Sequence, residues 1–556
     1  MKRMLSLFLA LLMLVTLSAC SREPEIATEP TAAEPEGVRY NTYLTADPIS
    51  MDVSKISDTY SAGVINNVME SLVRMGERDG SYTIIPGDAL TWESNADGTV
   101  WTFRLGNNTW SDGQSVTAHD YVYSLRRSAD PKTDCPNEYY LLPVAGYPEV
   151  REGAPLENLG VRALDDKTLQ ITLRYPVSSF LEMCCGTIYY PQRQDAVERF
   201  AEQYGTAPEY TLCNGPYTLE SWERDASITL KKREDYWNAK SVQIETVSIR
   251  IVKDSAAVCA MFEAGELDNV STSNTEWVET FLSMEDITYV KTFGATVNYV
   301  FYNTRDVIFS NANIRRAFTM AVDREALNTV AFGGNSNPAT GWVSPALSVG
   351  SITYRGFAGN MIQAMYADAN EKDMSARDYL LLGMAQLGLG DDPGALELSF
   401  SLGGTDAWFQ TLGTYLQQTY RDVLGVNVEV VYSDWSDFHD RVDSGNYQMG
   451  YMGWSANYND PYDVLSLFMS TNDSIHTGWS NAAFDELILK AQKEMDEAKR
   501  MQLYQEAEAI LLLGQYVVNP LLFPSSNNFY RNYVEGFANM AFSTGGYQTM
   551  TIGERP

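Results

Sequence analysis

The only long apolar run of this sequence lies at its beginning, and that position constrains the rest of the chain. The first residues read MKRMLSLFLALLMLVTLSAC, in which Lys2 and Arg3 precede an apolar segment from Met4 to Val15 and small residues lead to Cys20. This order predicts a secretory signal, and the apolar segment is too short for a membrane-spanning helix. Because no later segment has about 18 consecutive apolar residues, the remainder is expected to fold as a globular protein outside the cytoplasm.

The residues that follow the apolar run predict a lipid anchor and a spacer. LSAC resembles the lipobox of bacterial lipoproteins, in which the cysteine is acylated and the signal is cut just before it. We therefore expect residues 1–19 to be a signal peptide and Cys20 to carry lipid, which would attach the protein to the membrane. Residues 20–37 are rich in proline and glutamate and predict a disordered tether. The alternative is an ordinary signal with an incidental cysteine.

Composition bounds the number of domains and the classes of partner. The chain has 556 residues, of which 45% are hydrophobic and 12% aromatic, so it can bury a large core but is too long for one compact domain. Loss of the signal changes the formal net charge from −32 to −34. A chain this acidic is repelled by nucleic acid, which excludes nucleic acid as a partner. We attribute the charge to solubility rather than to a binding function.

Cysteine and histidine usage argues against metal and redox chemistry. Five cysteines remain after Cys20, no CxxC occurs, and the adjacent Cys184 and Cys185 are expected to be buried. An odd number leaves at least one cysteine unpaired. The three histidines are widely separated, so zinc sites and histidine-dependent triads are not expected. The sequence predicts no metal and no cofactor.

Strand and helix patterns alternate along the chain. TWESNADGTVWTFRL predicts a hairpin around Asp97 and Gly98; it also resembles a calcium loop, but Arg104 stands where a glutamate ligand is needed. SVTAHDYVYSLRRSADP predicts a capped helix that ends before Pro131, and NIRRAFTMAVDREALNTVAFGG predicts two helices with a new cap at Asp323. Two further amphipathic helices are expected between residues 480 and 513. The chain is therefore an α/β protein.

No segment nominates a catalytic site. LGLGDDPGA has its glycines one residue too far apart for a dinucleotide fold and follows a helical segment instead of a strand. There is no P-loop and no G-x-S-x-G motif. A pair of carboxylates could still be assembled in space, but no segment points to one. The sequence predicts a protein that is not an enzyme.

Several segments together resemble the family 5 solute-binding proteins of ABC transporters, the oligopeptide- and dipeptide-binding class. The helix SVTAHDYVYSLRRSADP keeps the family pattern A-x-D-x-x-x-S-x-x-R-x-x-x-P from Ala118 to Pro131. NGPYTLESW, FEAGELD, FYNT, IRRAFTMAVDREAL and SNAAFDELILKAQ match further family segments in the expected order. The resemblance covers about Thr42 to Phe537.

The resemblance implies a hinged trap with mixed sheets and three lobes, a periplasmic-binding-protein-like (class C) fold. The implied lobes are residues 38–68 with 187–291 and 525–556, residues 69–186, and residues 292–524. It implies a monomer that captures a peptide between closing lobes and delivers it to ABC permease subunits at the outer face of the bacterial cytoplasmic membrane. In such binders the peptide lies as an added strand with its side chains in wet pockets.

The stretch GWSANYNDPYDV, residues 453–464, resembles the family loop G-W-x-A-D-Y-x-D/E-P, whose Asp receives the peptide's amino group. Here that Asp is Asn457, and an amide cannot replace the charge. Either a neighbour such as Asp460 or Asp463 supplies the charge, or the ligand lacks a free amine. Tyr451 stands where some members have an arginine, so a ligand carboxylate would need another partner. The implied ligand-binding residues are Trp454, Ser455, Asn457, Tyr458 and Asp460 from this loop, with Ser57, Asp58 and Thr59 from the opposing wall. Tyr139 and Tyr140, from the second lobe, are weaker candidates.

Three other functions stay open at this point. The same fold could bind a metal chelate, haem, a sugar oligomer or another compound without an amine, which Asn457 favours. An exported hydrolase would need a pair of carboxylates that nothing in the sequence nominates. An adhesion or chaperone role would fit the acidic surface equally well.

Overall fold

The computed structural model describes residues 37–56, 58–78, 81–472, 474–537, 542 and 546–555. The predicted signal peptide, Cys20 and most of the tether lie outside these residues. From Val38 onward the chain forms one compact unit, so the division into three lobes stays a prediction. Within the described ranges no helix has the length and apolarity that crossing a membrane requires.

Two small sheets are built from the first half of the chain. Strands β1 (Arg39–Leu44), β10 (Thr246–Ile251), β9 (Ser227–Lys232) and β8 (Tyr217–Glu223) form the first in that order, with β1 parallel to β10 and the other pairs antiparallel. Strands β4 (Ala89–Ser94), β5 (Val100–Leu105), β7 (Thr168–Thr172) and β6 (Val161–Asp165) form an antiparallel second. The β4–β5 pair confirms the predicted hairpin.

Helix α3 (Ala118–Ala129) is the predicted capped helix. The Asp120 carboxylate accepts from the Thr117 backbone N–H at 2.8 Å, which satisfies a donor that the first turn leaves free. Arg127 on the same helix donates to both carboxylate oxygens of Asp52, at 2.6 and 2.7 Å, and so ties α3 to the segment before α2 (Thr59–Val68). Arg127, one of the residues that match the family pattern, therefore fixes the segment that leads into α2.

The largest sheet belongs to the second half of the chain. Its order is β11 (Asn269–Thr272), β20 (Val518–Arg531), β13 (Thr296–Tyr302), β19 (Met449–Ser455), β17 (Leu398–Leu402) and β18 (Val428–Tyr432). Strands β12 (Ile287–Phe293) and β14 (Ser336–Pro338) also pair with β20. Parallel pairs (β17 with β18 and β19) and antiparallel pairs (β13 with β19 and β20) make it a mixed sheet, as expected.

Helices cover both faces of this sheet because its central strand is apolar on both sides. In β13 the side chains of Val297, Tyr299 and Phe301 join one buried cluster, whereas Val300 and Tyr302 join another. The first cluster includes helices α11 (Tyr354–Ala358), α15 (Trp435–Asp443), α16 (Pro461–Leu465), α17 (Ala482–Lys493) and α18 (Glu497–Ala509). The second includes α9 (Ala312–Ala321), α10 (Arg324–Phe332), α13 (Ala376–Leu387) and α14 (Ala407–Leu424).

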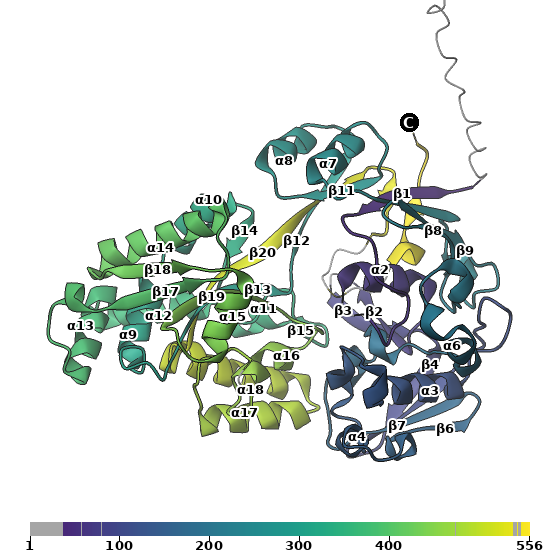
Figure 1. Cartoon of the computed structure of the whole chain (residues 1–556), viewed down its shortest axis with the longest axis horizontal. Coiled ribbons are helices and arrows are strands. Elements are labelled where there is room, and N and C mark those ends of the chain that lie inside the picture. Colours follow the sequence, from purple (N-terminus) through teal and green to yellow (C-terminus); the bar gives the residue numbers. More distant parts are fainter. Residues whose placement is uncertain are drawn as a thin grey trace, which may run out of the picture. The chain divides into compact units, whose positions relative to one another are not determined.

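The 14-residue strand β20 joins two groups of strands within this sheet, as the yellow strand of Figure 1 shows. One group is β11 and β12, and the other is β13, β14, β17, β18 and β19. Its first part pairs with β13 up to Leu522, and its second part pairs with β12 from Ser525 onward. The chain passes between the same two groups of strands at Gly294, whose N–H donates to the Pro524 carbonyl at 3.0 Å. Two neighbouring segments, 293–296 and 524–525, therefore make this connection.

The remaining predicted helices are confirmed. Asp323 caps α10 by accepting from the N–H groups of Glu325 and Ala326, and Gly333 ends it in the left-handed region at φ +58°. Helices α17 and α18 are the two amphipathic helices expected between residues 480 and 513, and α18 runs into a π-helical turn at Ile510–Gly514. Further helices are α7 (Ser255–Glu263), α8 (Thr275–Leu282) and α12 (Met361–Glu371).

All five cysteines from Cys135 to Cys259 are buried and unpaired. The expectation that Cys184 and Cys185 are buried is therefore confirmed. Burial raises the pKa of the Cys185 thiol, which disfavours the reactive thiolate. These cysteines pack as small apolar side chains.

Candidate functional site

A cavity of about 920 Å³ lies where the segments before residue 292 meet the loop that follows β19. One wall contains Asp58, Thr59, Asn66, Tyr139 and Tyr140, and the facing wall contains Ser455, Ala456, Asn457 and Tyr458. Gly294 and Ala295, from the connection between β12 and β13, also line it. The cavity thus has the size of a small-ligand site and is formed by residues far apart in the sequence.

The first wall is fixed by the start of helix α2. Asp58 caps this helix, because its Oδ1 accepts from the Ser61 N–H at 2.7 Å. Thr59 is the first helical residue, so both predicted residues line the cavity, while Ser57 lies outside the described residues. Tyr139 and Tyr140 follow from a short 3₁₀ segment, Glu138–Leu141, with their rings stacked at 4.4 Å between centroids.

The second wall combines three kinds of backbone. Residues 453–464, which match the family loop in sequence, are only partly a loop. Residues 453–455 complete β19, residues 456–460 form the loop, and Pro461–Leu465 is helix α16. Proline starts that helix well because its fixed φ is helical and its missing N–H is not needed in the first turn. The end of β19 carries Ser455 to the cavity, and the loop carries Asn457 and Tyr458.

Two predicted binding residues lie away from the lining. Trp454 pairs with Val297 across β13 and packs against the buried cluster on that face of the sheet. Asp460 is fully buried: its Oδ1 accepts from the Tyr462 N–H at 2.8 Å and the Tyr504 hydroxyl at 2.7 Å. Its Oδ2 lies 3.5 Å from Arg500, so Asp460 caps α16 and pairs with a buried arginine. Their contact with a ligand stays a prediction.

A second carboxylate lies directly behind Asn457. The Asn457 backbone N–H donates to Oδ2 of Asp463 at 2.6 Å, and its side-chain amide lies 3.4 Å from both carboxylate oxygens. Asp463 is 8% exposed, and burial raises the pKa of its carboxyl to about 6 despite these hydrogen bonds. Of the two neighbours considered from the sequence, Asp463 is therefore the one that contacts Asn457.

Sequence reasoning missed several lining residues. Glu182 and Cys185 come from the short helix α5 (Phe180–Met183) and the turn after it, in a segment with no periodic pattern. Burial and the nearby Asp460 raise the pKa of Glu182 to about 7, and Arg500 opposes this shift. Asn66, Asn137 and Thr187 add neutral hydrogen-bonding groups. Only the folded chain brings these residues together.

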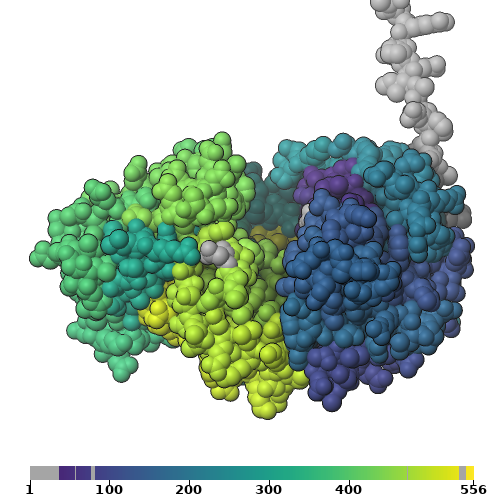
Figure 2. Space-filling model, turned by 60° about the horizontal axis from the view of Figure 1, so that its bottom comes forward, coloured from purple at the N-terminus to yellow at the C-terminus, as the bar shows by residue number. Residues whose placement is uncertain are grey.

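The two sides of the cavity also touch beyond it. The Ser178 N–H donates to the Gln492 carbonyl on α17 at 3.2 Å. Within the second side, the Gln492 side chain donates to the Tyr462 hydroxyl on α16 at 2.8 Å. In Figure 2 the blue and yellow-green surfaces meet side by side. Tyr458 likewise packs against the buried cluster of the first half of the chain. The loop and α17 are therefore held against α5 and its neighbours.

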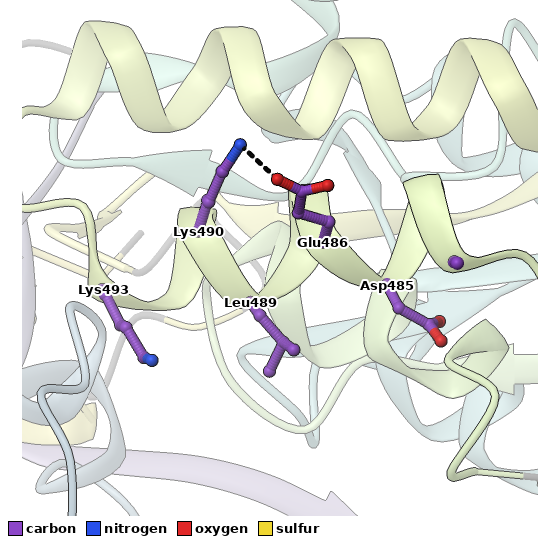
Figure 3. Close-up of a pocket in the computed structure, with 6 residues that line it drawn as sticks. Asp485, Glu486, Leu489, Lys490 and Lys493 are labelled. Carbon is purple, nitrogen blue, oxygen red and sulfur yellow. Dashed lines mark ion pairs between the residues drawn. The ribbon is translucent and has the colours of Figure 1, made fainter.

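A second depression, along α17, differs in kind (Figure 3). It has a volume of about 350 Å³ and is lined by Ala482, Asp485, Glu486, Leu489, Lys490 and Lys493. All of them belong to one helix, and Glu486 and Lys490 pair with each other at 2.7 Å. An exposed pair of this kind is typical of a helix surface and contributes little energy. The larger cavity is the candidate site.

The donor set of the cavity suits binding rather than catalysis. It offers hydroxyls, amides, two carboxylates and aromatic rings. Within the described part of the chain, no three His, Cys, Asp or Glu side chains gather as a metal site. A mixed α/β fold with a ligand-sized cavity, lined by segments from distant parts of the chain, is typical of a ligand-binding protein.

Comparison with known proteins identifies the family. The sequence profile of the bacterial extracellular solute-binding proteins, family 5 middle, matches residues 83–475. The oligopeptide-binding protein OppA of Bacillus subtilis (strain 168) is 30% identical over 492 residues, which is 87% of each chain. The probable deoxycholate-binding periplasmic protein YgiS of Escherichia coli (strain K12) is 27% identical over 90% of each chain. A murein tripeptide-binding protein, MppA, in its unliganded open form shares the fold with a TM-score of 0.77 at 24% identity, over 93% of this chain and 98% of that one.

The chain belongs to the family 5 extracellular solute-binding proteins. The resemblance drawn from the sequence and the periplasmic-binding-protein fold are thereby confirmed. The expectation that the chain is not an enzyme is also confirmed, because the relatives are binding proteins of transporters.

Proposed function

We propose that this protein is the substrate-binding component of an ABC importer and captures oligopeptides in the cavity between α2 and the loop after β19. The observation that carries the proposal is the cavity itself, with two walls from distant parts of a family 5 chain. Its lining offers the groups that a peptide main chain needs, including the amides of Asn66, Asn137 and Asn457. Tyr139, Tyr140 and Tyr458 supply flat apolar surfaces for peptide side chains.

Capture requires the two walls to move apart and together. We infer that the hinge lies at the segments 293–296 and 524–525, since these neighbouring segments join the two groups of strands within the large sheet. Because the two connecting segments are adjacent, the parts of the chain on either side of them could rotate about one axis while the buried core of each part stays intact. In the closed state the importer's permease would receive the ligand from a monomeric binding protein.

Saturable peptide binding is the first expected result. A diverse peptide library added to the chain without residues 1–20 should raise the unfolding temperature, because a ligand that binds only the folded state stabilises it by about 2.7 kcal/mol at 100 times its Kd. Tryptophan emission should change as well, since Trp454 lies beside the loop of the second wall. Absence of both changes across the library would refute the peptide assignment.

A second candidate is the same capture of a solute that is not a peptide. Asn457, in place of the family's Asp, favours it, as does the relative YgiS, a probable deoxycholate-binding protein. The two candidates differ in what the cavity holds after purification. Amino-acid analysis of released material distinguishes them.

We also propose that Cys20 carries lipid and holds the protein at the outer face of the cytoplasmic membrane. The support is the order of basic residues, apolar segment and small residues before Cys20. The full chain should sediment with membranes and incorporate a labelled fatty acid. Cys20→Ala should abolish the label, and equal labelling of that variant would refute the assignment. Cys135→Ala, which changes a buried cysteine, is the control.

A further inference from the structure

The cavity lining is negatively charged. Its acidic side chains are Asp58 and Glu182, the second with a pKa raised to about 7 by burial, and no lysine, arginine or histidine of the described residues lines it. A cavity with low-dielectric walls strengthens the field of such charges. A ligand that enters must therefore tolerate, or neutralise, the Asp58 carboxylate, and a cation beside Glu182 would favour the ionised form of that side chain.

Asp463 adds a third carboxylate immediately behind the lining. It is 92% buried, and within the described ranges no cationic side chain pairs with it. Its hydrogen bonds come from the backbone and side-chain amides of Asn457 and from the backbone of Tyr458, all of which are neutral donors. Burial raises the pKa of its carboxyl, and the neighbouring Asp460 acts in the same direction, while the hydrogen bonds offset the shift only in part. A cation at the surface of Asn457 would supply that missing partner.

The wall opposite Asn457 holds a further carboxylate oxygen that lacks a hydrogen-bond donor. Oδ1 of Asp58 accepts from the Ser61 N–H, whereas its Oδ2 is buried and has no hydrogen-bond partner. A buried acceptor without a donor is costly. A donor on the ligand would satisfy it, and the cost then becomes a preference for ligands that carry one.

The nearest arginine does not offset these charges. Arg500 is 4% exposed and pairs with Asp460, and Glu182 and Glu497 also act on it. Arg500 is thus one cationic group near three acidic side chains, Glu182, Asp460 and Glu497. The acidic groups of this region therefore outnumber the cationic ones. Arg500 does not line the cavity, and a ligand carboxylate could not reach it there.

We propose that the cavity selects peptides with a net positive charge, with Asp463 as the counter-charge of the ligand's ammonium group in place of residue 457. The inference rests on the proposed function and names its substrate class. Asp463 lies six residues after Asn457, on α16, and its carboxylate reaches the loop by accepting from the Asn457 N–H. Basic side chains are favoured by Asp58 and Glu182, and the ligand's terminal carboxylate receives no cationic partner from the lining.

Charge-matched peptides test this inference. Tri-, tetra- and pentapeptides carry lysine, norleucine or glutamate at one position, and the lysine form is also prepared N-acetylated or C-amidated. In titration calorimetry we expect lysine forms to bind about tenfold tighter than norleucine forms, and glutamate forms weakest. Acetylation should weaken binding by about 10- to 100-fold, whereas amidation should change it less than about threefold.

Two variants distinguish the effect of Asp463 from the effect of the protein's overall negative charge. In Asp463→Asn the acetylated and free peptides should bind alike, because the counter-charge is gone. Asp437→Asn, an exposed aspartate on α15, is the control and should keep the wild-type ratio. Circular dichroism checks that each variant is folded, and the wild-type comparison of acetylation with amidation needs no variant.

The outcomes distinguish the inference from the proposed function. If peptides bind regardless of charge, or if acetylation costs as much in Asp463→Asn as in wild type, the inference is overturned and the peptide-binding function stands. If no peptide binds, the proposed function fails. Binding of spermidine without binding of any peptide would overturn the proposed substrate class.

Discussion

Replacing Asp460 by alanine is expected to destabilise the protein by about 3–5 kcal/mol, the usual cost of removing one partner of a buried ion pair. Asp460 is fully buried, and it supports α16 through the Tyr462 N–H and α18 through Tyr504. Its loss leaves Arg500 buried without its ion-pair partner. Because α16 carries Asp463, ligand affinity should fall as an indirect consequence.

Urea unfolding followed by circular dichroism measures this effect. Asp460→Asn keeps an oxygen for the helix cap but removes the charge, so its destabilisation should be smaller than that of the alanine variant by about 0.5–2 kcal/mol, the value of a cap. Alanine and wild-type proteins that unfold at the same urea concentration, but differ in ligand affinity, would contradict this role and make Asp460 a ligand contact.

Glu508→Ala should cost about 3–5 kcal/mol as well, far from the cavity. Glu508 on α18 is fully buried, and its Oε1 accepts from the backbone N–H groups of Trp342 and Val343 at 2.8 and 3.2 Å. Its Oε2 accepts from the Tyr354 hydroxyl at 3.0 Å and pairs with Arg355. One carboxylate thus satisfies four donors from a loop and helix α11.

The matched control for this prediction is Glu506→Ala, two residues earlier on the same helix and exposed. It should change the free energy of unfolding by no more than about 0.5 kcal/mol. Urea unfolding of both variants provides the comparison. Equal stability of the Glu508 and Glu506 variants would show that the four hydrogen bonds are not what holds the loop.

Local patterns were sufficient for much of the fold. The β4–β5 hairpin follows from Asp97 and Gly98 between alternating residues, and α10 follows from its cap at Asp323 and its stop at Gly333. These signals lie within a few residues of what they determine. The family loop likewise identified Ser455, Asn457 and Tyr458, which line the cavity.

The remaining site residues depend on contacts between distant segments. Glu182 lies in a short helix without periodicity and meets the loop after β19 only in the folded chain. Trp454 alternates with Gly453 and Ser455 along β19, and its side chain packs on the sheet's apolar face rather than lining the cavity. The choice between Asp460 and Asp463 required the geometry of α16. Proximity in sequence did not distinguish them.

The central claim is that the cavity captures peptides, and native mass spectrometry tests it most directly. The chain without residues 1–20 is purified, and its mass is measured before and after mild unfolding that releases any ligand acquired in the cell. We predict a ladder of masses that fit short peptides, enriched in lysine and arginine. A single recurring mass that no combination of amino-acid residues fits would contradict the account.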